Sequence, residues 1–215
     1  MAKKFFNLIV LDKSGSMSAI RNQAIAGVNE TLGTIRKAKR DTGVAQEVSI
    51  LPFCGCSMSY IAQNADIDTI PVLTEREYMP CCNTPLLDAV GKGLTELKKH
   101  IGADPEAAVS VTIITDGYEN SSKEWTYPSV KALIESLRAE GWLFAFIGSN
   151  IDVEKVSNGL AINNFMAFKS DAEGTKAMFE KEMSSRSRWY KRHVDSGNML
   201  SNEEKQSLND DYFEL

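Results

Sequence analysis

The sequence predicts an α/β fold: a doubly wound, mostly parallel central sheet, flanked by helices, with one antiparallel edge strand. Short apolar runs alternate along the chain with longer segments of helical periodicity, which is typical of this class. Residues 5–11 and 107–115 are largely apolar without an alternating polar face, as expected for strands buried on both faces of a parallel sheet. An aspartate follows each of these two runs, Asp12 and Asp116.

Periodicity and capping residues place the individual elements. The predicted strands cover residues 5–11, 47–53, 57–63, 107–115, 142–148 and 162–168. The predicted helices cover residues 20–39, 85–101, 128–140, 153–160 and 171–193. Thr84 is the expected N-cap of the second helix, with Pro85 as its first residue, and Gly141 is expected to end the third. Pro52 should lie at the exit of its strand, because proline cannot donate to a sheet. Residues 64–77 are compatible with a short helix or a loop.

Composition indicates an ordinary soluble globular protein. The chain has 215 residues, 43% hydrophobic and 25% charged, which suits one domain with a sizeable core. We expect that domain to span residues 1–193, followed by a polar, acidic tail over residues 194–215 that is mobile or loosely docked. The net charge of −5 argues against nucleic acid as a partner. The first apolar run is short for a signal peptide, and no stretch approaches the ~20 apolar residues of a membrane span, so a cytoplasmic location is expected.

Oxygen-bearing side chains gather at the predicted carboxyl ends of the strands. Asp12, Ser14 and Ser16 alternate directly after the first strand, and a hard divalent cation prefers carboxylate and hydroxyl oxygens of this kind. Asp116 follows a second buried strand, and Thr84 lies before a helix. Ligand sites of such folds form beyond the carboxyl ends of the strands, so Asp12 and Asp116 would meet there if their strands are neighbours.

The motifs DKSGSM, TPL and ITDGYEN, in this order, resemble the von Willebrand factor type A (vWA) domain and its metal-ion-dependent adhesion site (MIDAS). Asp12-x-Ser14-x-Ser16 matches the D-x-S-x-S motif of the family, Thr84 its distal threonine, and Asp116 the aspartate of its T-D-G. The resemblance covers roughly residues 4–193, and small bacterial stand-alone members look most similar. It implies a Rossmann-like fold and a bound Mg²⁺ (or Mn²⁺, or Ca²⁺), held directly or through water. It also implies metal-dependent protein–protein interaction, in which an Asp or Glu of a partner protein completes the coordination.

Two alternatives stay open at this point. Asp and Ser are also favoured helix caps, so the first motif could be a capping loop, and the chain a metal-independent structural scaffold. A metal-dependent phosphatase or hydrolase is the enzymatic alternative. Haloacid-dehalogenase-type enzymes, however, need a second acid where this chain has Ser14, and neither a phosphate-binding G-x4-G-K-[ST] loop nor a G-x-S-x-G elbow is present. No residue of the motifs is placed as a general base, so we expect no catalytic residue, no organic cofactor and no enzymatic activity.

The four cysteines occur as Cys54-x-Cys56 and Cys81-Cys82. The simplest interpretation is reduced thiols that pack as small apolar residues in a cytosolic protein. A zinc site or a redox pair is the alternative. Zinc sites favour C-x2-C spacing and usually recruit histidine, and the two histidines, His100 and His193, lie far off in the sequence.

Overall fold

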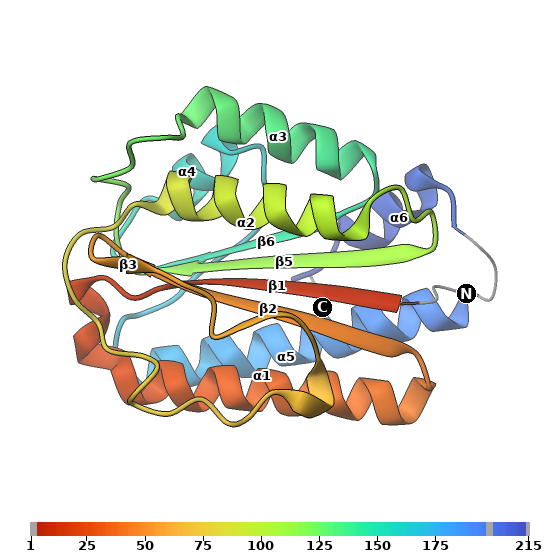
Figure 1. The fold of residues 1–215 in the computed structure, drawn as a ribbon, viewed down its shortest axis with the longest axis horizontal. Helices are drawn as coiled ribbons and strands as arrows, with labels where there is room; N and C mark the ends of the chain where they lie inside the picture. The colour runs from red at the N-terminus through yellow and green to blue at the C-terminus, as the bar shows by residue number, and fades with distance from the viewer. Residues whose placement is uncertain (1–3, 197–199, 214–215) are drawn as a thin grey trace.

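A seven-stranded sheet runs through the centre of the molecule, in a computed structural model that describes residues 4–196 and 200–213 (Figure 1). Its strand order is β3-β2-β1-β5-β6-β7, and β4 pairs with β2 as well. The strands are β1 (Lys4–Asp12), β2 (Ala45–Cys54), β3 (Ser57–Met58), β4 (Ala62–Asp66), β5 (Ala107–Thr115), β6 (Leu143–Gly148) and β7 (Asn164–Ala167). All pairings along β2-β1-β5-β6-β7 are parallel, whereas β3 and β4 pair antiparallel with β2. The predicted fold class, including an antiparallel edge, is confirmed.

Helices cover both faces of the sheet (Figure 1). They are α1 (Arg21–Thr42), α2 (Leu86–Ile101), α3 (Tyr127–Ala139), α4 (Val153–Gly159), α5 (Ala172–Asp195) and α6 (Asn202–Asn209), with short 3-10 helices η1 (Gly15–Ile20) and η2 (Ile67–Thr69). α1 and α5 lie on one face, and α2, α3 and α4 on the other. Every predicted helix is present, and so is every predicted strand but one, with ends shifted by a few residues. The strand predicted over residues 57–63 is instead two short strands, β3 and β4, which pair with different parts of β2. The region left open, residues 64–77, contains the rest of β4, then η2 and a loop.

The alternation of side chains along β1 explains why a nearly continuous apolar run is needed. Phe5, Ile9 and Leu11 belong to the core under α1 and α5, whereas Phe6, Leu8 and Val10 belong to the core under α2 and α3. A strand whose two faces are both covered by helices must be apolar at even and odd positions alike. β1 therefore lies at the centre of the sheet, between β2 and β5, and its last residue, Asp12, emerges where the sheet meets the loops.

The one polar residue inside β1, Asn7, belongs to a buried polar network on the α5 face. Arg186 of α5 forms an ion pair with Glu182, with 2.6 Å between Nη2 and Oε1, and both side chains are 1% exposed. Arg186 also donates to Asn7 Oδ1 at 2.9 Å and to Thr112 Oγ1 at 2.7 Å. A buried charge is tolerated only when it is paired and hydrogen-bonded, so this network fixes how α5 sits on the sheet.

The expectation of a mobile or loosely docked tail is wrong for its described part. Ser201 and Glu204 cap α6 reciprocally, and the Trp189 indole donates to Asn209 Oδ1 at 2.8 Å. Tyr212 and Phe213 are 3% and 7% exposed, because they join the core under α5. A few aromatic anchors are enough to dock a polar segment, which its overall composition does not reveal. Residues 197–199 and 214–215 of the predicted tail, and residues 1–3, lie outside the described residues.

Candidate metal centre

Asp12 lies at the carboxyl end of β1 and is fully buried. One of its carboxylate oxygens, Oδ1, accepts the backbone N–H of Ser14 at 2.7 Å, and the other, Oδ2, accepts the Thr115 hydroxyl at 2.5 Å. Burial raises the pKa of Asp12 from 3.8 to about 6, although the hydrogen bonds from Thr115 and Ser14 act in the opposite direction. The carboxylate is thus held in one orientation at a position where its charge is poorly solvated.

Ser14, Ser16 and Asp116 form a second set of contacts beside Asp12. The Ser16 hydroxyl donates to Asp116 Oδ1 at 2.5 Å, and the Ser14 and Ser16 hydroxyl oxygens lie 3.3 Å apart. This contact joins residues 100 positions apart in the sequence, because β1 and β5 are adjacent parallel strands that end at the same edge. Burial raises the pKa of Asp116 as well.

Asp116 Oδ2 is buried and has no hydrogen-bond partner among the described residues. An unpartnered carboxylate oxygen in a buried site costs free energy, and a cation is the kind of ligand that removes this cost. The surrounding donors are carboxylate and hydroxyl oxygens, the set that Mg²⁺, Mn²⁺ and Ca²⁺ prefer. The residues present therefore fit a hard divalent ion.

Thr84 reaches the same place from the loop before α2, although not as the expected helix cap. The N-cap position of α2 is Pro85, and the helix begins at Leu86. Instead, the Thr84 backbone is held by Asn120, which donates from its N–H to the Thr84 carbonyl at 3.1 Å and accepts the Thr84 N–H with its side chain at 2.8 Å. A Cβ added at Gly117 would lie 3.4 Å from Thr84 Oγ1 and 3.9 Å from Ser16 Oγ, so these two hydroxyls flank Gly117, next to Asp116.

All five residues singled out in the sequence thus gather at one edge of the sheet. The capping-loop alternative explains the geometry poorly, since Ser14 occupies the N-cap position of η1 without making a side-chain capping hydrogen bond. Whether an ion binds these five side chains stays a prediction.

Sequence reasoning missed the residues that support this cluster. Thr115 orients Asp12, and Tyr78, fully buried, donates its hydroxyl to the Asp12 carbonyl at 2.5 Å. Glu119 accepts the backbone N–H groups of Leu87 and of two residues of its own loop, which ties the Asp116 loop to the start of α2. Thr115 directly precedes Asp116 and Glu119 follows it in the same loop, so closeness in the sequence is the signal that could have found them. No local feature of the sequence points to Tyr78.

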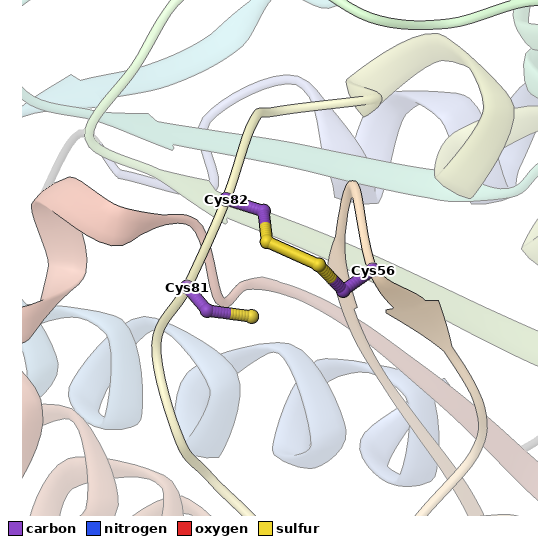
Figure 2. Close-up of side chains that lie close together, drawn as sticks. All are labelled: Cys56, Cys81 and Cys82. Carbon is purple, nitrogen blue, oxygen red and sulfur yellow. A yellow bond between two sulfur atoms is a disulfide. The ribbon is translucent and has the colours of Figure 1, made fainter.

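The cysteines lie beside this cluster, and the interpretation of four reduced thiols is wrong for two of them. Cys56 and Cys82 form a disulfide, and the Cys81 thiol points toward it (Figure 2). Cys54 and Cys81 are free thiols. The Cys82 carbonyl accepts the N–H of Gly15 at 3.1 Å, so the cysteine-bearing loop touches the loop that carries Ser14 and Ser16.

Several solved structures have a similar architecture. The manganese-loaded TRAP protein of Plasmodium vivax superposes with a TM-score of 0.57 at 16% identity, over 82% of this chain and 72% of that chain. The VWA domain of SpRpn10 gives 0.57 at 9% identity, over 85% and 94%. The pilus adhesin SpaC of Lactobacillus rhamnosus GG gives 0.64 at 12% identity, over 90% of this chain but 30% of the adhesin.

The other two comparisons found no match. Neither protein-family models nor curated proteins match the sequence. No helix among residues 4–196 and 200–213 is long and apolar enough to cross a membrane. The strand order, the flanking helices and these structural neighbours together show that the chain has the von Willebrand factor type A fold.

Proposed function

We propose that this chain is a metal-dependent protein–protein interaction module. Its five site residues, Asp12, Ser14, Ser16, Thr84 and Asp116, would hold Mg²⁺, or else Mn²⁺ or Ca²⁺, directly or through water. A bound divalent ion supplies an open coordination position that attracts a carboxylate, here an Asp or Glu of a partner protein. The observation that carries the proposal is the buried Asp116 Oδ2, which has no partner among the described residues and lies within a set of oxygen donors.

The charges of the site explain why it would bind an acidic partner. Two carboxylates, Asp12 and Asp116, balance a doubly charged cation, whereas the hydroxyls of the three other residues add dipoles without charge. Thr115 and the Ser14 backbone orient Asp12 in advance, which lowers the entropic cost of binding. A hydroxyl that donates to a carboxylate keeps lone pairs for a cation, so the contact between Ser16 and Asp116 is compatible with both serving as ligands.

The comparisons support the proposal at the level of the family. A manganese-loaded structure is among the neighbours with this fold, and the neighbours include an adhesin. We propose a binding role rather than catalysis, because neither histidine lies at the site: His193 is buried against Trp189, and His100 pairs with Glu47. The cytoplasmic location expected from the sequence stays part of this proposal.

Calorimetric titration of Mg²⁺ and Mn²⁺ into chelator-treated protein tests the proposal. We expect saturable binding to the wild type that is lost in Asp116→Ala and Ser14→Ala. Ser18→Ala, the same change at an exposed serine of η1, should bind like the wild type. Each titration is repeated with an excess of a short Glu-containing peptide, so that a site that needs its acidic ligand is also detected. Absence of binding in both formats would refute the proposal in favour of a metal-independent scaffold. Turnover of phosphate esters that disappears in Asp12→Ala would favour the enzymatic alternative.

A further inference from the structure

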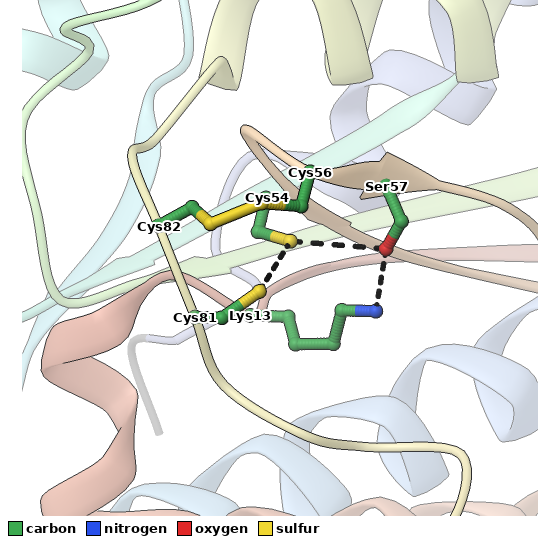
Figure 3. Close-up of a disulfide and its surroundings, with 6 residues drawn as sticks. All are labelled: Lys13, Cys54, Cys56, Ser57, Cys81 and Cys82. Carbon is green, nitrogen blue, oxygen red and sulfur yellow. Dashed lines mark hydrogen bonds between the residues drawn. A yellow bond between two sulfur atoms is a disulfide. The ribbon is translucent and has the colours of Figure 1, made fainter.

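The fold brings all four cysteines to one place from two distant segments (Figure 3). Cys54 ends β2 and Cys56 follows in the turn before β3, whereas Cys81 and Cys82 lie in the loop before α2. The Cys54 and Cys81 sulfur atoms lie 3.3 Å apart. The sulfur atoms of Cys56, Cys81 and Cys82 all lie within 4.8 Å of one another. Cys54 is outside this mutual group and adjoins it through its contact with Cys81. The four cysteines therefore lie close together, which the spacing in the sequence did not indicate.

Backbone contacts hold the two segments together independently of the sulfur chemistry. The N–H of Gly55 donates to the carbonyl of Asn83 at 2.8 Å. The N–H of Cys81 donates to the carbonyl of Lys13 at 2.9 Å, and the N–H of Lys13 donates in turn to the carbonyl of Phe53 at 2.8 Å. A Cβ added at Gly55 would lie 3.3 Å from the backbone nitrogen of Asn83, so glycine permits this close approach. The four sulfurs would accordingly stay close together if the disulfide were reduced.

We propose that the reduced form of this cluster is a Zn²⁺ site with Cys54, Cys56, Cys81 and Cys82 as its four ligands. Structural zinc sites are tetrahedral with Zn–S distances of about 2.3 Å, which corresponds to about 3.8 Å between sulfur atoms. The 3.3 Å between Cys54 and Cys81 is slightly shorter than this spacing, and the 4.8 Å limit for the other three allows it. The Cys54 sulfur atom lies more than 4.8 Å from at least one of the Cys56 and Cys82 sulfur atoms, so the Cys54 side chain has to turn toward them to complete the tetrahedron.

Two steps convert the disulfide form of the site into the zinc-bound form. A water-soluble phosphine reduces the Cys56–Cys82 disulfide to two thiols and is itself oxidised to the phosphine oxide, with water supplying the oxygen and the two protons. Zn²⁺ then replaces the protons of four thiols, which gives a centre of net charge −2 and releases four protons. In a reducing compartment thiols stay reduced, and grouped cysteines there are more often metal ligands than structural disulfides.

Neighbouring groups suit a negatively charged thiolate centre. The Ser57 hydroxyl lies 3.7 Å from Cys54 Sγ and accepts a hydrogen bond from Lys13 Nζ at 2.8 Å (Figure 3). A positive charge and a hydroxyl beside the sulfur atoms stabilise thiolates, as groups that hydrogen-bond to the ligands of metal sites do. Lys13, which stands between Asp12 and Ser14 in the sequence, thus has a contact directed toward the cysteines.

The zinc site and the oxygen site share no ligand and select different ions. Thiolates favour Zn²⁺, whereas carboxylate and hydroxyl oxygens favour Mg²⁺. Through Cys81 and Cys82, bound zinc would fix the loop that contains Thr84, two residues further on. The zinc proposal does not depend on the proposed binding function, because a scaffold without the oxygen-bound ion would carry the cysteine cluster equally well.

The test uses the full chain, reduced with phosphine and handled without oxygen. Co²⁺ is titrated first, because tetrahedral thiolate coordination gives it strong charge-transfer and visible absorption, and Zn²⁺ is then added to displace it. We expect the thiolate band to saturate at one equivalent of Co²⁺ and to disappear with one equivalent of Zn²⁺, and we expect Cys54→Ser and Cys81→Ser to lose the band. Asp116→Ala, which alters the oxygen site, should keep the full spectrum. Oxidised protein that retains its disulfide should not give it.

Several outcomes would overturn the proposal. The first is reduced wild-type protein that gives no thiolate charge-transfer band at stoichiometric Co²⁺. The second is a band that persists unchanged in both serine variants. The third is an ion lost in Asp116→Ala but retained in the cysteine variants, which would assign it to the oxygen site. The wild-type titration decides the matter even if a serine variant fails to fold.

Discussion

Replacing Asp12 by Asn should stabilise the metal-free protein and at the same time abolish its response to Mg²⁺. Asp12 is fully buried and its charge lies near that of Asp116. Without a cation, ionised Asp12 is therefore an unfavourable feature of the folded state. Asparagine keeps the shape, and its carbonyl oxygen can still accept the Ser14 N–H, while the Thr115 hydroxyl can accept from the new amide.

The magnitude follows from the pKa. Burial raises the pKa of Asp12 from 3.8 to about 6, so the folded protein binds its proton more tightly than the unfolded chain does. Each pKa unit corresponds to about 1.4 kcal/mol, so at pH 7 the ionised group lowers the free energy of unfolding by about 3 kcal/mol. This penalty disappears as the pH falls from above 6 toward 4. Asp12 alone thus makes the metal-free protein more stable at pH 5 than at pH 7, and Asp12→Asn removes that dependence.

Urea unfolding at pH 7 and pH 5, in chelator and in saturating Mg²⁺, measures these effects. A ligand at 100 times its Kd stabilises the folded state by about 2.7 kcal/mol, which the wild type should show and Asp12→Asn should not. Asp211→Asn, the same change at an exposed aspartate, should leave the free energy of unfolding in chelator and the stabilisation by Mg²⁺ unchanged. The reasoning is refuted if Asp12→Asn is clearly less stable than the wild type in chelator, or if it keeps the stabilisation by Mg²⁺.

Two further predictions concern the core under α5. Arg186→Met should lower the free energy of unfolding by about 3–5 kcal/mol, because it leaves the buried carboxylate of Glu182 uncompensated, whereas Arg186→Met combined with Glu182→Leu should recover much of the loss in urea unfolding. An additive loss in the double variant would contradict this. Burial lowers the pKa of His193 from 6.5 to about 4, so the unfolded chain takes up a proton at this residue more readily than the folded protein does. The free energy of unfolding should therefore fall by up to about 3 kcal/mol as the pH decreases from 6.5 through 4. His193→Phe should flatten this part of the stability–pH curve; equal curves for wild type and His193→Phe would rule the mechanism out.

The sequence by itself determined the architecture, because the signals of its elements are local. Apolar runs without alternation at residues 5–11 and 107–115 indicated strands covered on both faces, and these became the adjacent strands β1 and β5. Since parallel neighbours end at the same edge, the aspartates that follow them, Asp12 and Asp116, were predictable as a pair. The other candidate ligands followed from motifs with residue types suited to a hard cation.

Only the tertiary structure decided features that depend on contacts between distant segments. Thr84 turned out to be held by Asn120 rather than capping α2, and Tyr78 reached the Asp12 carbonyl across 66 residues. Cysteines that formed no recognisable motif converged because the turn at Gly55 packs against Asn83. The tail docked through Tyr212 and Phe213, although its composition is polar. Local patterns record which face of an element is buried, but they do not record which distant residue covers it, since that depends on the free energy of the whole packed chain.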